Sequence, residues 1–395
     1  MRPTFVTTTL FALLVWMAQS AAASAAGSVS DTAPEAAAAS LVQALNQRNE
    51  SAAVDFLDMA ALGQRIAQAA TTNPTEQRQM ARGLNEGTAH KLIQSYFKTL
   101  DARQGTVRLM RITQRDGQVL ALVRFDLGGS GFDYLEFMLQ PDASGRYRVV
   151  DWYQLSRGEL ISVNLGALVK LMGDPDPDLV HRLLGTARFD PNQIDKLKRI
   201  GALQRSGDYA GALAAANQLP PEIADSRVVL TIRVGLASLA GNKAEYHRLL
   251  GVLAHKFSDD PAAAFLLIDY YFAEHQMEKA LQCVVTIERR VGSDGVTSLL
   301  KANINMMTGA YAQGVALAQQ AIQLEPDFKD PYYTLAMNYA GLKQYPQAIA
   351  VYKSIATRFK VRFDRQHFEQ EPRLAGLVQS AEFQKWLPAP RSPKS

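Results

Sequence analysis

Asp151 is the residue whose type and setting come nearest to acid–base chemistry in this sequence. It stands in a strand-like run, 147–154, where simple alternation places it on one face with Val149 and Tyr153. Asp151 and Tyr153 are therefore candidate residues of a ligand cavity. Acid–base catalysis needs a second group within hydrogen-bonding reach, and the one nearby histidine, His90, lies outside the strands. A carboxylate without such a partner is more often bonded to a turn or an arginine, so we predict a structural Asp151 and no catalytic residue.

The other reactive side chains and loop motifs give no reason to expect a metal ion or a cofactor. Cys283 is the only cysteine, which excludes an internal disulfide, and its valine neighbours favour a small buried residue. No histidine or cysteine cluster has zinc-ligand spacing. The glycines at 128–131 join two strands and lack the lysine and helix of a phosphate loop, and the aspartates at 174–178 lack the glycine and glutamate of a calcium loop. The sequence therefore predicts a protein that is not an enzyme.

Length and composition indicate a globular chain of two or three domains. The 395 residues are 47% hydrophobic and 20% charged. The net charge is +4, and no run of lysine and arginine is interleaved with aromatic residues as in proteins that follow a phosphate backbone. We therefore expect no nucleic-acid partner.

A short turn signature recurs along the second half of the chain. It begins at Gly207, Gly241, His275, Gly309 and Lys343, each 34 residues after the last. Five residues after each start stand Ala212, Tyr246, Ala280, Gly314 and Ala348, four of which are small enough for a close contact between helices. A fixed period of this length indicates a repeat array in which each unit buries its apolar face on the next. We predict five helical pairs over residues 193–361, forming an all-α solenoid.

The period and the motifs at 311–326 and 345–349 resemble the tetratricopeptide repeat, with Tyr246 as a departure at the small position. The resemblance implies that another protein binds in a groove lined by the first helix of each pair. It places the following residues in that groove: Thr231, Phe265, Asp269, Phe272, Leu299, Asn303, Met306, Tyr333 and Met337. The set is largely apolar, which suits an amphipathic helix or an apolar extended segment. An alternative stays open for Phe265, Phe272 and Leu299, which can instead belong to the core between repeats.

The N-terminal part combines an export signal with an α+β domain. Residues 1–26 have a positive start, a short apolar run and a small-residue stretch, which predict a cleaved signal peptide and a periplasmic or secreted protein. In the domain, 34–173, helical spacing predicts two helices over 34–70 and a third over 76–101. Four strands follow at 106–113, 118–126, 132–140 and 147–154, joined by short turns such as Asp116-Gly117, which predict a four-stranded antiparallel sheet.

Helices followed by a bent antiparallel sheet resemble the nuclear transport factor 2-like superfamily, and 147–165 is also similar to the end of periplasmic phospholipid carriers. Both resemblances imply an apolar cavity between helix and sheet. Two prolines then mark a linker and leading helix at 174–192. Capping helices are predicted at 362–388, followed by a disordered tail at 389–395.

Two functions fit these patterns. The first is an exported, non-enzymatic scaffold or adaptor that binds a protein segment in the solenoid groove. The alternative is a carrier that holds a small apolar or lipid ligand in the N-terminal domain. No membrane span is expected after signal cleavage, because no later stretch has about 20 consecutive apolar residues.

Overall fold

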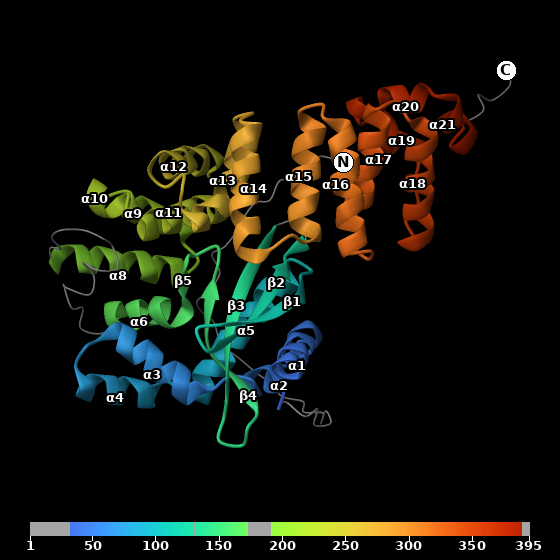
Figure 1. The fold of residues 1–395 in the computed structure, drawn as a ribbon. Helices are drawn as coiled ribbons and strands as arrows, with labels where there is room; N and C mark the ends of the chain where they lie inside the picture. Colours follow the sequence, from blue (N-terminus) through green and yellow to red (C-terminus); the bar gives the residue numbers. More distant parts are fainter. Residues whose placement is uncertain (1–31, 129–130, 173–190, 389–395) are drawn as a thin grey trace. The chain divides into compact units, whose positions relative to one another are not determined.

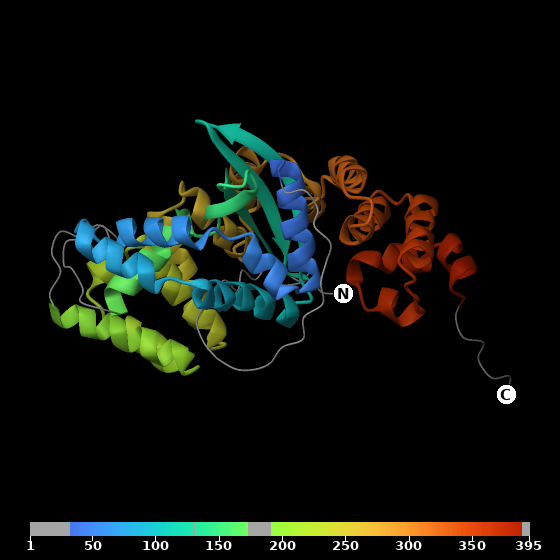
Figure 2. The ribbon, with the colours of Figure 1, turned by 90° about the horizontal axis from the view of Figure 1, so that it is seen from below.

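The computed structural model describes residues 32–128, 131–172 and 191–388. An N-terminal region of helices and antiparallel sheet is followed by a largely helical part (Figures 1 and 2). The described residues up to Leu266 form one compact unit and those from Leu267 onward form another. The predicted signal peptide, most of the predicted linker and the C-terminal tail lie outside the described residues.

The N-terminal helices are more divided than predicted. The span 34–70 holds α1 (Pro34–Gln47), α2 (Glu50–Asp55) and α3 (Met59–Ala70), and the predicted third helix is split into α4 (Pro74–Gly83) and α5 (Glu86–Ala102). The prediction of two helices and then one is wrong because polar caps interrupt the apolar period. The side chains of Asn49 and Asp58 accept hydrogen bonds from the first turns of α2 and α3 and so start new helices.

The sheet has five strands instead of four, in the order β1-β2-β3-β4-β5. They are β1 (Thr106–Arg115), β2 (Gln118–Asp126), β3 (Phe132–Pro141), β4 (Tyr147–Gln154) and β5 (Glu159–Leu160). The first four match the predicted runs. The strand β5 was not predicted, because two residues are too few to show an alternating pattern of apolar and polar side chains. Asp116 and Gly117 both have positive φ (51° and 73°), as the predicted tight hairpin between β1 and β2 requires.

One face of the sheet and the first helices form the core of the N-terminal region. Leu41, Phe97, Phe125, Phe137 and Trp152 belong to one cluster of buried side chains. Helix α1 contacts β1 and β2, and α3 contacts β4. The core is therefore a helix layer packed on an antiparallel sheet.

Seven of the described helices complete the first compact unit, the last of them only in part. They are α6 (Ile161–Met172), α8 (Pro191–Arg205), α9 (Tyr209–Ala216), α10 (Pro221–Ala224), α11 (Arg227–Leu239) and α12 (Lys243–Lys256), and α13 (Pro261–Ala273) continues into the second unit. Helix α8 contacts α9, and α11 contacts both α9 and α12. Neighbouring helices along the chain therefore pack on each other.

The second unit continues with α14 (Met277–Val291), α15 (Gly295–Met307), α16 (Tyr311–Leu324), α17 (Asp330–Gly341) and α18 (Tyr345–Arg358). The second helix of each predicted pair begins at Tyr209, Lys243, Met277, Tyr311 or Tyr345, so the starts 209, 243, 277, 311 and 345 keep a spacing of 34. In the first helices, α11, α13 and α15 begin at 227, 261 and 295 and keep the same spacing. The helix boundaries thus follow the period of the sequence.

Short helices end the described chain: α19 (Arg365–Glu369), a 3-10 turn (Pro372–Leu374), α20 (Ala375–Gln379) and α21 (Ala381–Trp386). Phe368, Leu377 and Phe383 from this segment are buried together with Tyr352 and Ile355 of α18. Within the described ranges, no helix has the length and apolar character needed to cross a membrane.

Candidate functional site

Asp151 is a fully buried structural carboxylate. It accepts hydrogen bonds from the hydroxyl and backbone N–H of Ser162 (2.6 and 3.2 Å) and from the backbone N–H of Trp152 (2.9 Å). Burial raises its pKa even though these donors and the more distant Arg65 (4.0 Å) oppose that shift. The two hydrogen bonds from Ser162 tie the start of α6 to β4, as the structural interpretation of Asp151 predicts.

The prediction that Asp151 shares one face of the strand with Val149 is wrong. Val149 pairs with Leu139 and Asp151 pairs with Met138, so Val150 is an extra residue in the ladder. This bulge puts Val149 on the side of Trp152 and leaves Asp151 on the other side with Tyr153, which is half-buried. Asp151 and Tyr153 thus share a face, but that face is not the one that carries the main core.

A second buried carboxylate, Asp133 in β3, was not singled out in the sequence. Its oxygens accept from the Gln154 side chain (2.7 Å), the Ser156 hydroxyl (2.8 Å) and the backbone N–H groups of Tyr134 and Ser156 (2.8 and 3.2 Å). Burial raises the pKa of Asp133. Both oxygens are occupied by protein donors, so the group fixes the turn after β4 and has no free atom for a substrate. In the sequence, alternation places Asp133 on the same face of the strand as Leu135 and Phe137. This pattern could have identified Asp133 as a buried carboxylate.

The interior beside Asp133 is filled by aromatic side chains. The Trp152 ring N–H donates to the Tyr96 hydroxyl (3.0 Å), and the Phe125 and Phe137 rings lie 5.5 and 5.8 Å from Tyr96 and Trp152 respectively. Burial raises the pKa of Tyr96 to about 12. Tyr96 is therefore neutral at physiological pH and serves as an acceptor for the indole. These rings fill the interior between the helices and this face of the sheet.

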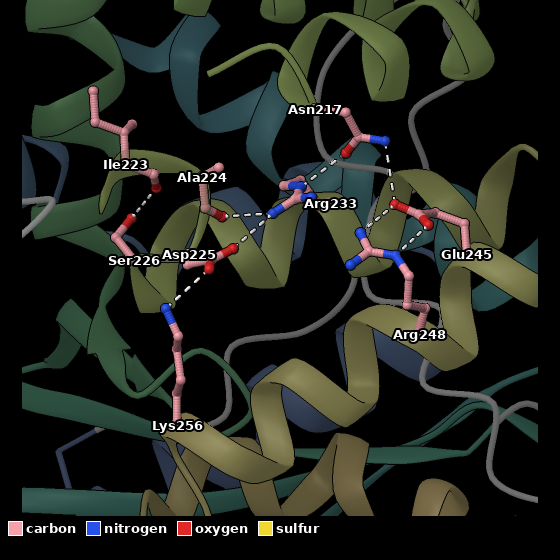
Figure 3. Close-up of polar contacts among 9 residues, drawn as sticks. All are labelled: Asn217, Ile223, Ala224, Asp225, Ser226, Arg233, Glu245, Arg248 and Lys256. Carbon is pink, nitrogen blue, oxygen red and sulfur yellow. Dashed lines mark hydrogen bonds and ion pairs between the residues drawn. The ribbon is translucent and has the colours of Figure 1, made fainter. Parts of the chain in front are cut away.

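A polar network joins α9 to α12 (Figure 3). The buried Arg233 of α11 donates to the Asn217 side chain (2.9 Å), the Ala224 carbonyl (3.0 Å) and the Asp225 carboxylate (3.1 Å). Asp225 is also paired with Lys256 (2.9 Å). Each charged side chain of the network has an opposite charge or a hydrogen-bond partner. We therefore interpret the network as a structural link between consecutive helices.

A shallow depression of about 250 Å³ lies beside this network. It is lined by Ala210, Leu213, Ala214, Asn217, Ala240 and Asn242. The two amides are engaged, because Asn217 donates to Glu245 (3.1 Å) and Asn242 accepts from the Glu245 N–H (3.1 Å). Small side chains and occupied amides leave this depression without a group that could select a ligand.

The groove residues expected in the first compact unit are engaged by their own chain. The Thr231 hydroxyl donates to the Arg227 carbonyl one turn earlier (2.8 Å). Phe265 is 2% exposed, and its ring lies 5.8 Å from Phe132 and 6.3 Å from Tyr134 of β3. Phe265 therefore joins α13 to the sheet and is not accessible to a partner in this structure.

The expected groove residues in the second unit differ in their exposure. Phe272, Leu299 and Met306 are buried, as the alternative left open for Phe272 and Leu299 describes. Asn303, Tyr333 and Met337 are only partly buried. The side-chain amide oxygen of Asn303 accepts from the Thr334 hydroxyl (2.8 Å), and the Tyr333 ring lies 6.2 Å from Phe363 and 6.5 Å from Tyr352. Asn303, Tyr333 and Met337 are therefore the expected groove positions of this unit that keep some exposed surface.

Asp269 of α13 is the exception among the buried acids. It is 9% exposed, and neither carboxylate oxygen has a hydrogen-bond partner within the described residues. Burial raises its pKa well above the usual range. Asp269, Asn303 and Met337 occupy the same position in consecutive first helices, 34 residues apart, and are called here the first-helix row.

Among the residues that the structure describes, no other group suggests a catalytic or metal centre. The Cys283 thiol is buried, and burial raises its pKa to about 12, so it stays protonated at neutral pH. Within the described ranges, no three histidine, cysteine or acidic side chains gather as metal ligands would. Comparison with protein-family models gives no match for this chain, and comparison with curated proteins gives no relative.

Proposed function

We propose that this chain is an exported, non-enzymatic interaction scaffold, and that its helical pairs form a tetratricopeptide-like solenoid that binds a segment of another protein. The observation that carries the proposal is the common spacing of 34 between the starts of α9, α12, α14, α16 and α18. Helical pairs in constant register stack into an extended array whose first helices share one face. Binding along that face is the usual activity of such arrays.

The packing of the second helices supports the array. Ala212, Ala280 and Ala348 are completely buried, and Gly314 lies against the Asn338 side chain of the next pair. Small residues at this recurrent position let successive helices approach closely. The period is therefore built into the contacts between neighbouring helices.

Fewer than nine of the predicted groove positions are open to a partner. Phe265 is covered by β3, and the turn at Gly158 lies against Ala262 of the same helix, where an added Cβ would be 2.9 Å from the Ala262 Cβ. The N-terminal region thus occupies the start of α13. We assign the partner contact to the partly buried Asn303, Tyr333 and Met337, with an apolar or amphipathic segment as the occupant.

Site-specific photocrosslinking in cells that express the chain tests this assignment. A photoreactive residue is placed at Asn303 or Met337, and at Gln323 of α16 as a matched control, since Gln323 is exposed on a second helix. We expect covalent protein adducts from the two row positions and not from the control. Equal adducts at all three positions, or none, would contradict a binding face on the first helices.

The alternative of a lipid or small-ligand carrier has weaker support, because Tyr96, Phe125, Phe137 and Trp152 are packed together where the ligand would lie. Native mass spectrometry of the purified chain separates the two functions. A retained mass of phospholipid size would favour the carrier, and the bare mass of the chain is expected for the scaffold.

A further inference from the structure

The two edges of the sheet in the N-terminal region differ in how the chain covers them. On the β4 side, the Val149 N–H donates to the Phe56 carbonyl (2.7 Å), and the Val149 carbonyl accepts from the Asp58 N–H (2.9 Å). The end of β4 is paired with β5. Strand β1 is the last strand on the opposite side, and within the described ranges no further strand pairs with it there. An outer strand of this kind presents backbone donors and acceptors to which another extended chain can bind.

Only the beginning of β1 is covered along this edge. The Asn46 side chain of α1 accepts from the Val107 N–H (2.8 Å) and donates to the Val107 carbonyl (2.7 Å), so both Val107 groups point away from β2. Alternation along the antiparallel ladder directs the N–H and carbonyl groups of Leu109, Ile112 and Gln114 to the same side. No residue in the described part of the chain forms a hydrogen bond with them on that side. Leu109 and Ile112 are half-buried and Gln114 is exposed, so this stretch of β1 is open to pairing.

A bulge gives the open edge two different faces. Met110 is an extra residue in the ladder between β1 and β2, and it shifts the alternation of side chains by one position. Ile112 therefore packs on the core. Arg108, Arg111 and Arg115 lie together on the opposite face of β1, and all three are exposed. The edge is thus apolar on one face and cationic on the other.

Two kinds of added strand can be weighed against these faces. A second copy of β1 would bring its own Arg108, Arg111 and Arg115 next to the same three residues, and like charges on neighbouring strands are destabilising. A segment that alternates acidic and apolar residues fits both faces. Its acidic side chains lie beside the arginines, and its apolar side chains extend the surface of Leu109 and Ile112.

We propose that the outer side of β1, from Leu109 to Gln114, binds an extended partner segment as an added strand, and that this segment alternates acidic and apolar side chains. Hydrogen bonds between the two backbones provide the affinity, and the alternating side chains provide the specificity. The site belongs to the N-terminal region and is separate from the groove positions Asn303, Tyr333 and Met337.

Selection of random peptides displayed on phage tests the inference with the purified full chain. Gln114→Pro removes one outward N–H without removing a hydrogen bond to β2, and Gln114→Ala keeps that N–H as the matched control. We expect a class of peptides with alternating acidic and apolar residues that binds the wild type and Gln114→Ala equally. The same peptides should bind Gln114→Pro at least about tenfold more weakly and should be unaffected by Met337→Asp in the groove. If no enriched peptide distinguishes Gln114→Pro from Gln114→Ala, the inference is overturned.

Two changes to one enriched peptide separate strand addition from attraction between charges alone. Methylation of every second amide nitrogen blocks one edge of the peptide, so one of the two alternate sets should abolish binding and the other should change it by about threefold or less. Replacing the acidic residues by glutamine should weaken binding to the wild type about tenfold, and should weaken binding to Arg111→Gln less. Equal effects of the two methylated sets would show that the peptide binds without adding a strand.

The oligomeric state tests whether a second copy occupies the edge instead. Sedimentation velocity of the wild type and of Gln114→Pro provides the measurement. We expect the same oligomeric state for both chains. A wild-type dimer that Gln114→Pro converts to a monomer would show that β1 pairs with itself, and would overturn the assignment of an acidic partner segment.

Discussion

At the scale of single residues, burial decides which acidic groups shape the pH response of this protein. The pKa of Asp269 is raised by burial with no opposing hydrogen bond. The folded state therefore holds a proton at Asp269 over a pH range in which the unfolded chain has lost it. Stability from this group is present at low pH and is lost as pH rises from about 4 through the raised folded-state pKa.

The first prediction is that Asp269→Asn removes this pH dependence. The free energy of unfolding of the variant should exceed that of the wild type by about 1–3 kcal/mol at pH 7, and the difference should vanish near pH 4. Calorimetric melting curves of both chains between pH 4 and 8 provide the measurement. Parallel curves for wild type and Asp269→Asn would show that Asp269 has a partner after all.

Some features of single residues could not be predicted from the sequence. The structural character of Asp151 followed from its lack of a catalytic partner, whereas its face depended on a bulge at Val150 that alternation cannot reveal. Nor does the sequence of α13 show that the Asp269 carboxylate is buried without a hydrogen-bond donor. Such facts become visible only when the helices are placed side by side.

At the scale of elements, periodic signals predicted the strands and the second helices well. The four longer strands and the spacing of 34 between second helices follow directly from alternation and from the recurring turn. The division into α2 and α3 was missed, although Asn49 and Asp58 are capping residues of the usual type. Phe265 was expected in a groove because the sequence of its own helix does not indicate that Phe132 and Tyr134 cover it.

The second prediction concerns the contact between α16 and α17. A Cβ added to Gly314 would lie 2.6 Å from the Asn338 Cγ, and Asn338 is fully buried with its amide held by the Thr334 carbonyl (2.8 Å). Alanine is favoured over glycine in a helix by about 1 kcal/mol, but overpacking costs about 1–3 kcal/mol. We therefore expect Gly314→Ala to lower the melting temperature.

A double-mutant cycle provides the control for this contact. Asn338→Ala removes the obstructing side chain, so Gly314→Ala should be neutral or stabilising in that background. Thermal unfolding of the wild type, both single variants and the double variant gives the coupling free energy. If Gly314→Ala has the same effect in both backgrounds, the two positions do not constrain each other.

At the scale of the whole molecule, a helical array must close its last apolar face. Tyr352 of α18 is 3% exposed, and its ring lies 4.9 Å from Phe368 and 6.1 Å from Trp386. These aromatic residues belong to the segment that the sequence predicts as a cap. Their helical spacing predicted the segment, while its division at Pro372 into short helices reflects the fixed φ of proline.

The third prediction follows from this closure. A chain that ends at Val361 lacks Phe363, Phe368, Phe383 and Trp386, which leaves the α18 surface around Tyr352 and Ile355 open to water. Because an exposed repeat interface is unstable and adhesive, we expect faster amide exchange in α17 and α18 and self-association of the shortened chain. Hydrogen exchange with mass spectrometry and light scattering after gel filtration measure the two effects. A chain that ends at Pro388 keeps all four aromatic residues and should match the full chain. If the chain ending at Val361 stays monomeric with unchanged protection in α18, the C-terminal segment does not act as a cap, and the array closes in some other way.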